Sequence, residues 1–166
     1  MIGFNHKSIS FAVLFMLTTA GFTGTALGAE SFNLDGSHSY LLFKVEHLGL
    51  ANSYGRFNAV SGTILFDPDQ PANSRFAFTV DANSVDTGNE KRDQHLRSGD
   101  FFDVANHAAI TFESRSVKAL GGDRFEVTGD ITLLGNTRSV TAEVIQTGAG
   151  KDPWGNHRRG FETQFS

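Results

Sequence analysis

The sequence predicts an all-β fold, an antiparallel up-and-down barrel with one short helix inserted between strands 3 and 4. Apolar residues recur at every second position over most of the chain, and the connections between these runs are short. Of the 16 Phe residues, four precede residue 29 and twelve follow it. A barrel removes exposed sheet edges and can hold one small ligand, which gives the Phe residues a role. A flat sandwich is the alternative.

The first three strands are predicted over residues 37–47, 54–66 and 75–82. Apolar side chains take one parity of the first strand and charged ones the other, so one face is directed toward a core. The second strand loses its alternation near Ala59, which indicates a bulge or a bend at Gly62.

The later strands are predicted over residues 109–117, 124–134 and 140–144, with a last one that begins at Gly160. Gly121 and Gly122 form the turn between the first two of these strands. Gly135 and Asn136 suit a two-residue hairpin turn, because both residue types tolerate positive φ. The strands therefore follow one another as a meander.

Residues 84–103 form a charged, helix-permissive insert, with a helix predicted over 89–96. The insert must cross an end or a face of the barrel, so we expect the helix over one mouth with Phe101 and Phe102 plugging beneath it. Guanidinium groups suit phosphate, so the insert offers ligands for an anionic head group. Alternatively, its charges pair among themselves and pin the helix. The head-group candidates are Arg92, His95 and Arg97.

The N-terminus has the pattern of a secretory signal peptide. His6 and Lys7 precede an apolar run at residues 9–17, and small residues follow up to Gly28 and Ala29. We predict a signal peptide over residues 1–28, cleaved after Gly28 or Ala29, and an exported domain over residues 29–166. The run is shorter than the about 20 apolar residues that span a bilayer, so stable membrane insertion is not expected. An uncleaved N-terminal anchor is the alternative.

Composition argues against several classes of function. The formal net charge is −4 and no basic run occurs, so nucleic acid and anionic membrane surfaces are not expected partners. The chain has no Cys, so a buried core must stabilise it. It has no Gly-rich phosphate loop, no Gly-x-Ser-x-Gly and no His-Glu-x-x-His. We therefore predict no catalytic residues, no metal site and no cofactor.

The candidate site is an apolar cavity inside the barrel, because Phe-rich alternation on nearly every strand is what a ligand tunnel needs. A filled core would have the same pattern. His47 has the inward parity, so it either offers a hydrogen bond to a head group or is a core His satisfied by backbone groups. The predicted cavity residues are Phe43, Val45, His47, Phe57, Phe66, Phe78, Phe101, Phe102, Phe112 and Ile131.

Ordered motifs over residues 32–162 identify the chain as similar to the YceI-like family. They include His38-Ser39, Phe43-x-Val45-x-His47-Leu48-Gly49, Ser84-Val85-Asp86-Thr87, Asp100-Phe101-Phe102-Asp103 and Asp152-Pro153-Trp154-Gly155. The resemblance implies a lipocalin-like barrel around a long hydrophobic cavity. It also implies a periplasmic protein that binds a long-chain amphiphile, a polyisoprenoid or an isoprenoid quinone, with no established enzymatic activity.

Family members usually extend further at the C-terminus, completing the strand that begins at Gly160 and adding a last strand. The resemblance therefore implies a barrel that is C-terminally incomplete, with last strands missing. The edge at residues 38–47 would then lack a full partner, which favours pairing with another chain and a possible homodimer.

Three functions stay open on the sequence alone. The first is an exported carrier or reservoir for an amphiphilic lipid. The second is an enzyme that acts on such amphiphiles, with His47, His95 and Asp100 as candidate acid–base groups. The third is a ligand-free structural or stress-protective barrel.

Overall fold

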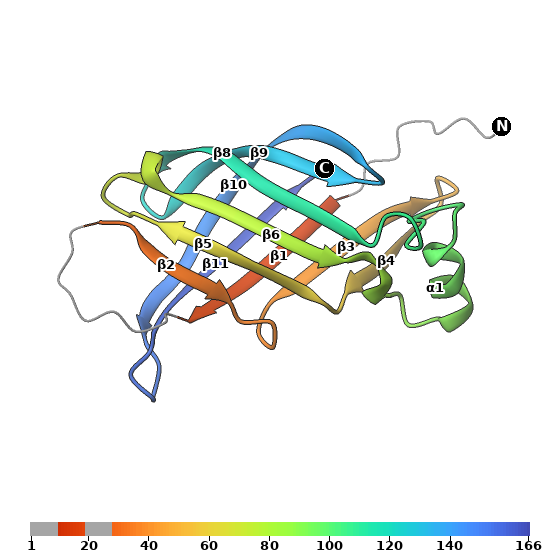
Figure 1. The fold of residues 1–166 in the computed structure, drawn as a ribbon, viewed down its shortest axis with the longest axis horizontal. Helices are drawn as coiled ribbons and strands as arrows, with labels where there is room; N and C mark the ends of the chain where they lie inside the picture. Colours follow the sequence, from red (N-terminus) through yellow and green to blue (C-terminus); the bar gives the residue numbers. More distant parts are fainter. Residues whose placement is uncertain (1–9, 19–27) are drawn as a thin grey trace.

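The chain folds into one antiparallel sheet that curls into a barrel, with a short helix at one end (Figure 1). The computed structural model describes residues 10–18 and 28–166. The strands in this part of the chain are β1 (Ser10–Thr18), β2 (Glu30–Leu34), β3 (Tyr40–His47), β4 (Ala51–Phe57), β5 (Val60–Phe66), β6 (Arg75–Asp81), β7 (Val85–Asp86), β8 (Ala109–Gly121), β9 (Arg124–Leu133), β10 (Asn136–Lys151) and β11 (His157–Phe165). They pair in the order β11-β10-β9-β8-β6-β5-β2-β1-β3-β4-β7, and β1 also pairs with β11. The predicted fold class is confirmed.

One stretch of the barrel wall, predicted as a single long strand, is broken in the middle. β4 and β5 divide the predicted strand 54–66 at Asn58 and Ala59, where the alternation slips. The break is therefore not at Gly62, which lies within β5 and pairs in register with Phe78. β4 pairs with β3, whereas β5 pairs with β2 and β6. The backbone of β6 leaves no room for a side chain at Gly62, since a Cβ there would be 2.4 Å from the Ala77 carbonyl oxygen. A side chain at this position would push the two strands apart.

Several predicted strand boundaries differ from the structure, and β10 in particular is much longer than the predicted 140–144. The turn between β9 and β10 consists of Leu134 and Gly135, with φ of 52° and 69°, rather than Gly135 and Asn136. A two-residue turn of this kind needs two positive φ values, and Asn136 instead pairs with Leu133 while its side chain donates to the Leu134 carbonyl oxygen. β11 begins at His157, before the predicted Gly160.

Aromatic rings pack in two groups along the inside of the barrel. In the first group, the Phe66 ring lies 5.2 Å from Phe125 and 5.1 Å from Phe161, both nearly perpendicular to it. In the second, Phe57 lies 5.5 Å from Phe43 and 5.4 Å from Phe102. Edge-to-face contacts of this kind stabilise a core beyond simple area burial.

The helix α1 (Glu90–Arg97) is held against the end of the barrel by buried polar contacts. Asn89 caps it by accepting from the Arg92 amide. The carboxylate of Asp93 is buried and accepts from the amide and the hydroxyl of Thr87. These contacts fix the start of the helix to the chain that leaves β7.

Only one of the two predicted plug residues lies under the helix. Phe102 is half-buried and reaches the core through Phe57, as expected. Phe101 is 42 % exposed and contacts the His95 ring at 4.9 Å instead. Adjacent residues after the helix point in different directions, so the interior takes one ring and the surface the other.

β1 closes the sheet. Residues 11–16 pair with β11, and Phe15 lies opposite Phe161. On its other side, residues 10–14 pair with β3 and residues 17–18 with β2. The expected open edge at residues 38–47 is therefore paired in the full chain, because part of the predicted signal peptide supplies a strand. The rest of that segment, residues 1–9 and 19–27, lies outside the described residues.

Removing β1 tests this closure. In a chain that starts at Ala29, the amides of residues 41–44 that bond to β1 should exchange much faster than in the full chain, because they face water. The amides of β9 are the internal control, since β9 pairs only with β8 and β10. Hydrogen exchange by mass spectrometry gives the comparison. Equal protection of residues 41–44 in two monomeric chains would contradict the pairing of β1.

Candidate functional site

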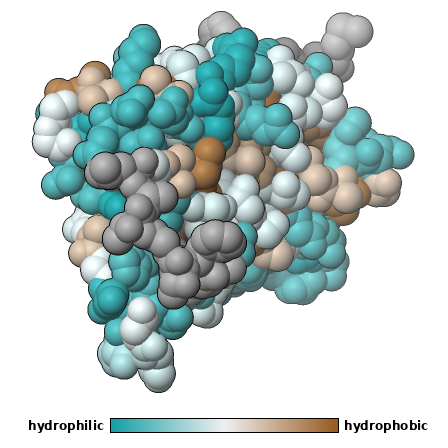
Figure 2. Space-filling model, turned by 60° about the vertical axis from the view of Figure 1, so that its left-hand side comes forward, coloured by the Kyte–Doolittle hydropathy of each residue, from teal (hydrophilic) through white to brown (hydrophobic). Residues whose placement is uncertain are grey.

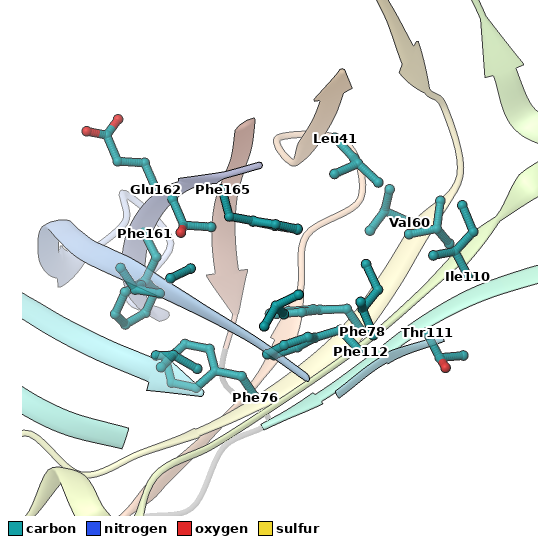
Figure 3. A pocket seen from close by; sticks show the side chains of 17 residues that line it. Leu41, Val60, Phe76, Phe78, Ile110, Thr111, Phe112, Phe161, Glu162 and Phe165 are labelled. Carbon is teal, nitrogen blue, oxygen red and sulfur yellow. The ribbon is translucent and has the colours of Figure 1, made fainter. Parts of the chain in front are cut away.

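An apolar cavity of about 90 Å³ lies inside the barrel (Figure 3). Phe78 and Phe112 stack at its side, with ring centroids 6.2 Å apart. Glu162 borders the cavity, but its carboxylate points away from the rings (Figure 3). The lining residues are Leu41, Val60, Phe76, Phe78, Val80, Ile110, Thr111, Phe112, Val127, Ile131, Val140, Ala142, Val144, Phe161, Glu162, Thr163 and Phe165.

The structure places the predicted cavity residues in three environments. Phe78, Phe112 and Ile131 line the cavity. The second set packs in the core around it: Phe43, Val45, Phe57, Phe66 and Phe102. His47 and Phe101 lie away from the cavity as exposed side chains. His47 is exposed because the β3–β4 hairpin extends past the barrel, so the inward parity no longer faces an interior there.

The predicted head-group residues bind the protein itself. Arg92 donates to the hydroxyl and the carbonyl of Thr87, at 2.7 and 2.9 Å. Arg97 donates to the carbonyl oxygens of Asn83 and Val85. These contacts agree with the second interpretation of the insert, in which its charged side chains hold the helix in place. Their role as ligands for a head group stays a prediction.

A second concave surface, a groove of about 440 Å³, lies at the end of β10 and the start of β11. A β-bulge shifts the register of these strands between Gln146 and Gly148 and leaves Thr147 as the extra residue. The four residues from Thr147 to Gly150 are small, so little side chain fills the space beside them. Figure 2 brings this end of the barrel forward and shows a mostly hydrophilic face.

Arg158 fixes the strand end that borders this groove. Its guanidinium is 2.8 Å from Asp35 and 2.7 Å from Asp152, and its side chain is 17 % exposed. Hydrogen bonds from Ser37, together with His38 and Arg158, hold the pKa of Asp35 well below its usual range. Burial alone would raise the pKa of Asp152, but hydrogen bonds from Asn156 and Arg158 outweigh it and lower that pKa to about 2.

Arg159, the next residue, was missed in the sequence. It shares the inward parity of Phe161, and its guanidinium lies 5.7 Å from the Phe32 ring and 5.2 Å from the Phe66 ring. Nη1 donates to Oε1 of Gln146 at 3.0 Å. The predicted strand begins at Gly160 and so does not include Arg159. With a start at His157, strand alternation would have placed Arg159 on the inward face.

Two further features bear on function. No group of three or more His, Asp or Glu side chains is placed to hold a metal ion within the described part of the chain. Among the same residues, no helix has the length and apolar character needed to cross a membrane.

The Asp152 contacts predict a dependence of stability on pH. The folded-state pKa of about 2 lies below the ordinary 3.8, so the carboxylate stabilises the fold above about pH 4 and loses this contribution as the pH falls through 2. Asp152→Asn should lower the melting temperature at pH 7. The melting temperature of this variant should also fall less on acidification than that of wild type. Part of the fall should remain, because Asp35 still takes up a proton in the same direction. Asp123→Asn, at an exposed turn, is the control. Thermal melts at a series of pH values that superimpose for wild type and Asp152→Asn would refute this role.

Comparison with known proteins agrees with this fold. The family model of the YceI-like domain matches residues 32–166. A UPF0312 protein of Pectobacterium atrosepticum is 41% identical over 157 residues, which cover 94% of this chain and 80% of that protein. Protein YceI of Salmonella agona is 39% identical over 165 residues, 99% of this chain and 81% of that protein.

Solved structures show the same likeness. The crystal structure of the Campylobacter jejuni YCEI protein aligns with a TM-score of 0.63 and 29% identity over 72% of this chain and 70% of that chain. Burkholderia cenocepacia BcnA, at 17% identity, shares the fold, with a TM-score of 0.60 over 93% of this chain and 96% of that chain. The family match spans most of the sequence, and the two curated relatives are matched over about four-fifths of their length. The chain belongs to the YceI-like family.

Proposed function

We propose that this protein is an exported binding protein that holds the hydrocarbon chain of an amphiphilic lipid in the barrel cavity. The observation that carries the proposal is the cavity itself, because its walls are almost entirely aliphatic and aromatic. A polyisoprenoid or an isoprenoid quinone fits this chemistry, since its chain has only apolar surface to bury. Family membership supports the same ligand class.

Burial of the chain would supply the affinity. Each buried methylene contributes about 0.8 kcal/mol, so a dozen contribute roughly 10 kcal/mol, against association costs of about 4–15 kcal/mol. The cavity of about 90 Å³ is smaller than the roughly 300–1,000 Å³ of ordinary ligand pockets. A long chain therefore has to widen the interior, and the stacked rings of Phe78 and Phe112 are the side chains that border the available space.

Binding is favoured over catalysis by where the titratable groups lie. His95 is 3.2 Å from Asp100, but both side chains are exposed beside α1. His47 is exposed at the end of β3. None of these three lines the cavity, so an acid–base pair next to a bound chain is not formed by them.

Filling the cavity tests the proposal. Ala142 lines the cavity, whereas Thr141, the preceding residue of β10, is exposed. Ala142→Phe should weaken binding of a neutral fluorescent probe, the methyl ester of dansylaminoundecanoic acid, by about tenfold or more, because it removes space for at least two methylenes. Thr141→Phe should leave the affinity unchanged. A folded Ala142→Phe protein that binds the ester like wild type would rule the cavity out as the site.

The proposed export has its own test. A signal peptide over residues 1–28 would leave a mature protein that starts at Ala29 or Glu30, and both Gly28 and Ala29 are exposed. The protein isolated from the periplasmic fraction of its host should show this N-terminus by intact mass and N-terminal sequencing. Soluble protein that retains Met1 would refute cleavage.

A further inference from the structure

Arg159 carries a charge that no carboxylate balances in the described part of the chain. Its contacts there are the hydrogen bond to Gln146 and the two ring faces of Phe32 and Phe66. A guanidinium has five N–H donors, so most of them are left for another acceptor. Aromatic faces stabilise the cation but accept no strong hydrogen bond, so they do not replace an anion.

The neighbouring Arg158 shows what a structural arginine looks like at this place. Two carboxylates, Asp35 and Asp152, bind it at 2.8 and 2.7 Å, and its charge is more than balanced. The protein thus supplies two acids to one arginine and none to the next. A half-buried arginine that serves only the fold would gain from such a partner, because burial of an unpaired charge is costly.

The groove beside Arg159 has room for the missing anion. It is lined by the small residues that follow the bulge at Thr147. Lys151 and His38 also border it, as does the Arg158–Asp152 ion pair, in which the carboxylate is already neutralised. Its volume of about 440 Å³ is in the range of ordinary small-molecule sites. β-bulges often occur next to functional sites, because they re-aim side chains and interrupt strand pairing.

One layer of aromatic rings separates this guanidinium from the cavity. Arg159 lies over Phe66, Phe66 packs against Phe161 at 5.1 Å, and Phe161 lines the cavity. A head group in the groove and a chain in the cavity would therefore lie on the two sides of the Phe66–Phe161 contact. This end of the barrel is opposite the end covered by α1 (Figure 1).

We propose that Arg159 binds the anionic head group, a carboxylate or a phosphate, of the amphiphile whose chain the barrel holds. This rests on the proposed function for the position of the chain. The guanidinium offers a planar fork that matches two oxygens of either group. The head-group end of the barrel is then the β10–β11 end and not the α1 end.

The test compares charged and neutral forms of one probe. Wild type should bind dansylaminoundecanoic acid about ten to a hundred times more tightly than its methyl ester, the effect of one charge-assisted hydrogen-bonded pair. Arg159→Met should bring this ratio to near one while the ester affinity stays the same, and Arg159→Lys should keep part of it. Arg138→Met, which removes an exposed arginine of β10 outside the groove, should keep the full ratio. Circular dichroism melts check that each variant is folded.

Competition separates the two anions. Displacement of the ester by farnesyl phosphate and by farnesol, in wild type and in Arg159→Met, shows whether a phosphate gains from Arg159 as a carboxylate does. An acid-to-ester ratio that is unchanged in folded Arg159→Met, with no loss of preference for farnesyl phosphate over farnesol, would overturn the proposal.

A separate measurement distinguishes failure of the head-group site from failure of the proposed function. If wild type binds no form of the probe, the proposed function fails, and titration with inorganic phosphate then tests Arg159 alone. A saturable shift of its Nε–Hε resonance, absent for Arg138, would support the anion site. No shift would overturn it.

Discussion

Backbone pairing of β1 with β11 on one side, and with β3 and β2 on the other, is the interaction on which the barrel depends. Without β1, the strands β3, β4 and β7 lose their backbone pairing to the rest of the sheet, and β2, β3 and β11 each gain an unpaired edge. Unpaired edges expose backbone donors and acceptors to water and to other chains. Closure also encloses the cavity, because Leu41 of β3 and Phe165 of β11 line it and both lie in strands that pair with β1.

The sequence predicts most of the barrel wall, because a period of two is a local signal, but it does not predict β1, β2 or β7 as strands. The bend between β4 and β5 and the charged helix are also visible in it, at Ala59 and over residues 89–96. The site is less predictable. Strand alternation distinguishes side chains that face the interior from those that face solvent. It does not distinguish Phe78, which borders the cavity, from Phe66, which is fully buried among other rings. That distinction depends on how strands far apart in sequence pack.

Two features could not be read from local patterns. His47 has the inward parity, yet the strand has already left the barrel when it reaches that residue. The apolar run at residues 9–17 has the composition of a signal peptide, and residues 10–18 also pair as a strand, because an apolar segment meets open edges of β3 and β11. Both properties follow from the same residues. Under the proposed export, cleavage would remove β1 and open a seam that runs beside the cavity, where a long chain could widen the interior.

Organic extraction of the protein purified from its own host, followed by mass spectrometry, tests most directly whether the barrel holds an amphiphile. We expect a long-chain lipid in near-stoichiometric amount from the folded protein, with an apolar chain that the cavity encloses and an anionic group at one end. Folded protein that releases no lipid on extraction, and that does not take up such a lipid afterwards, would contradict binding in the cavity.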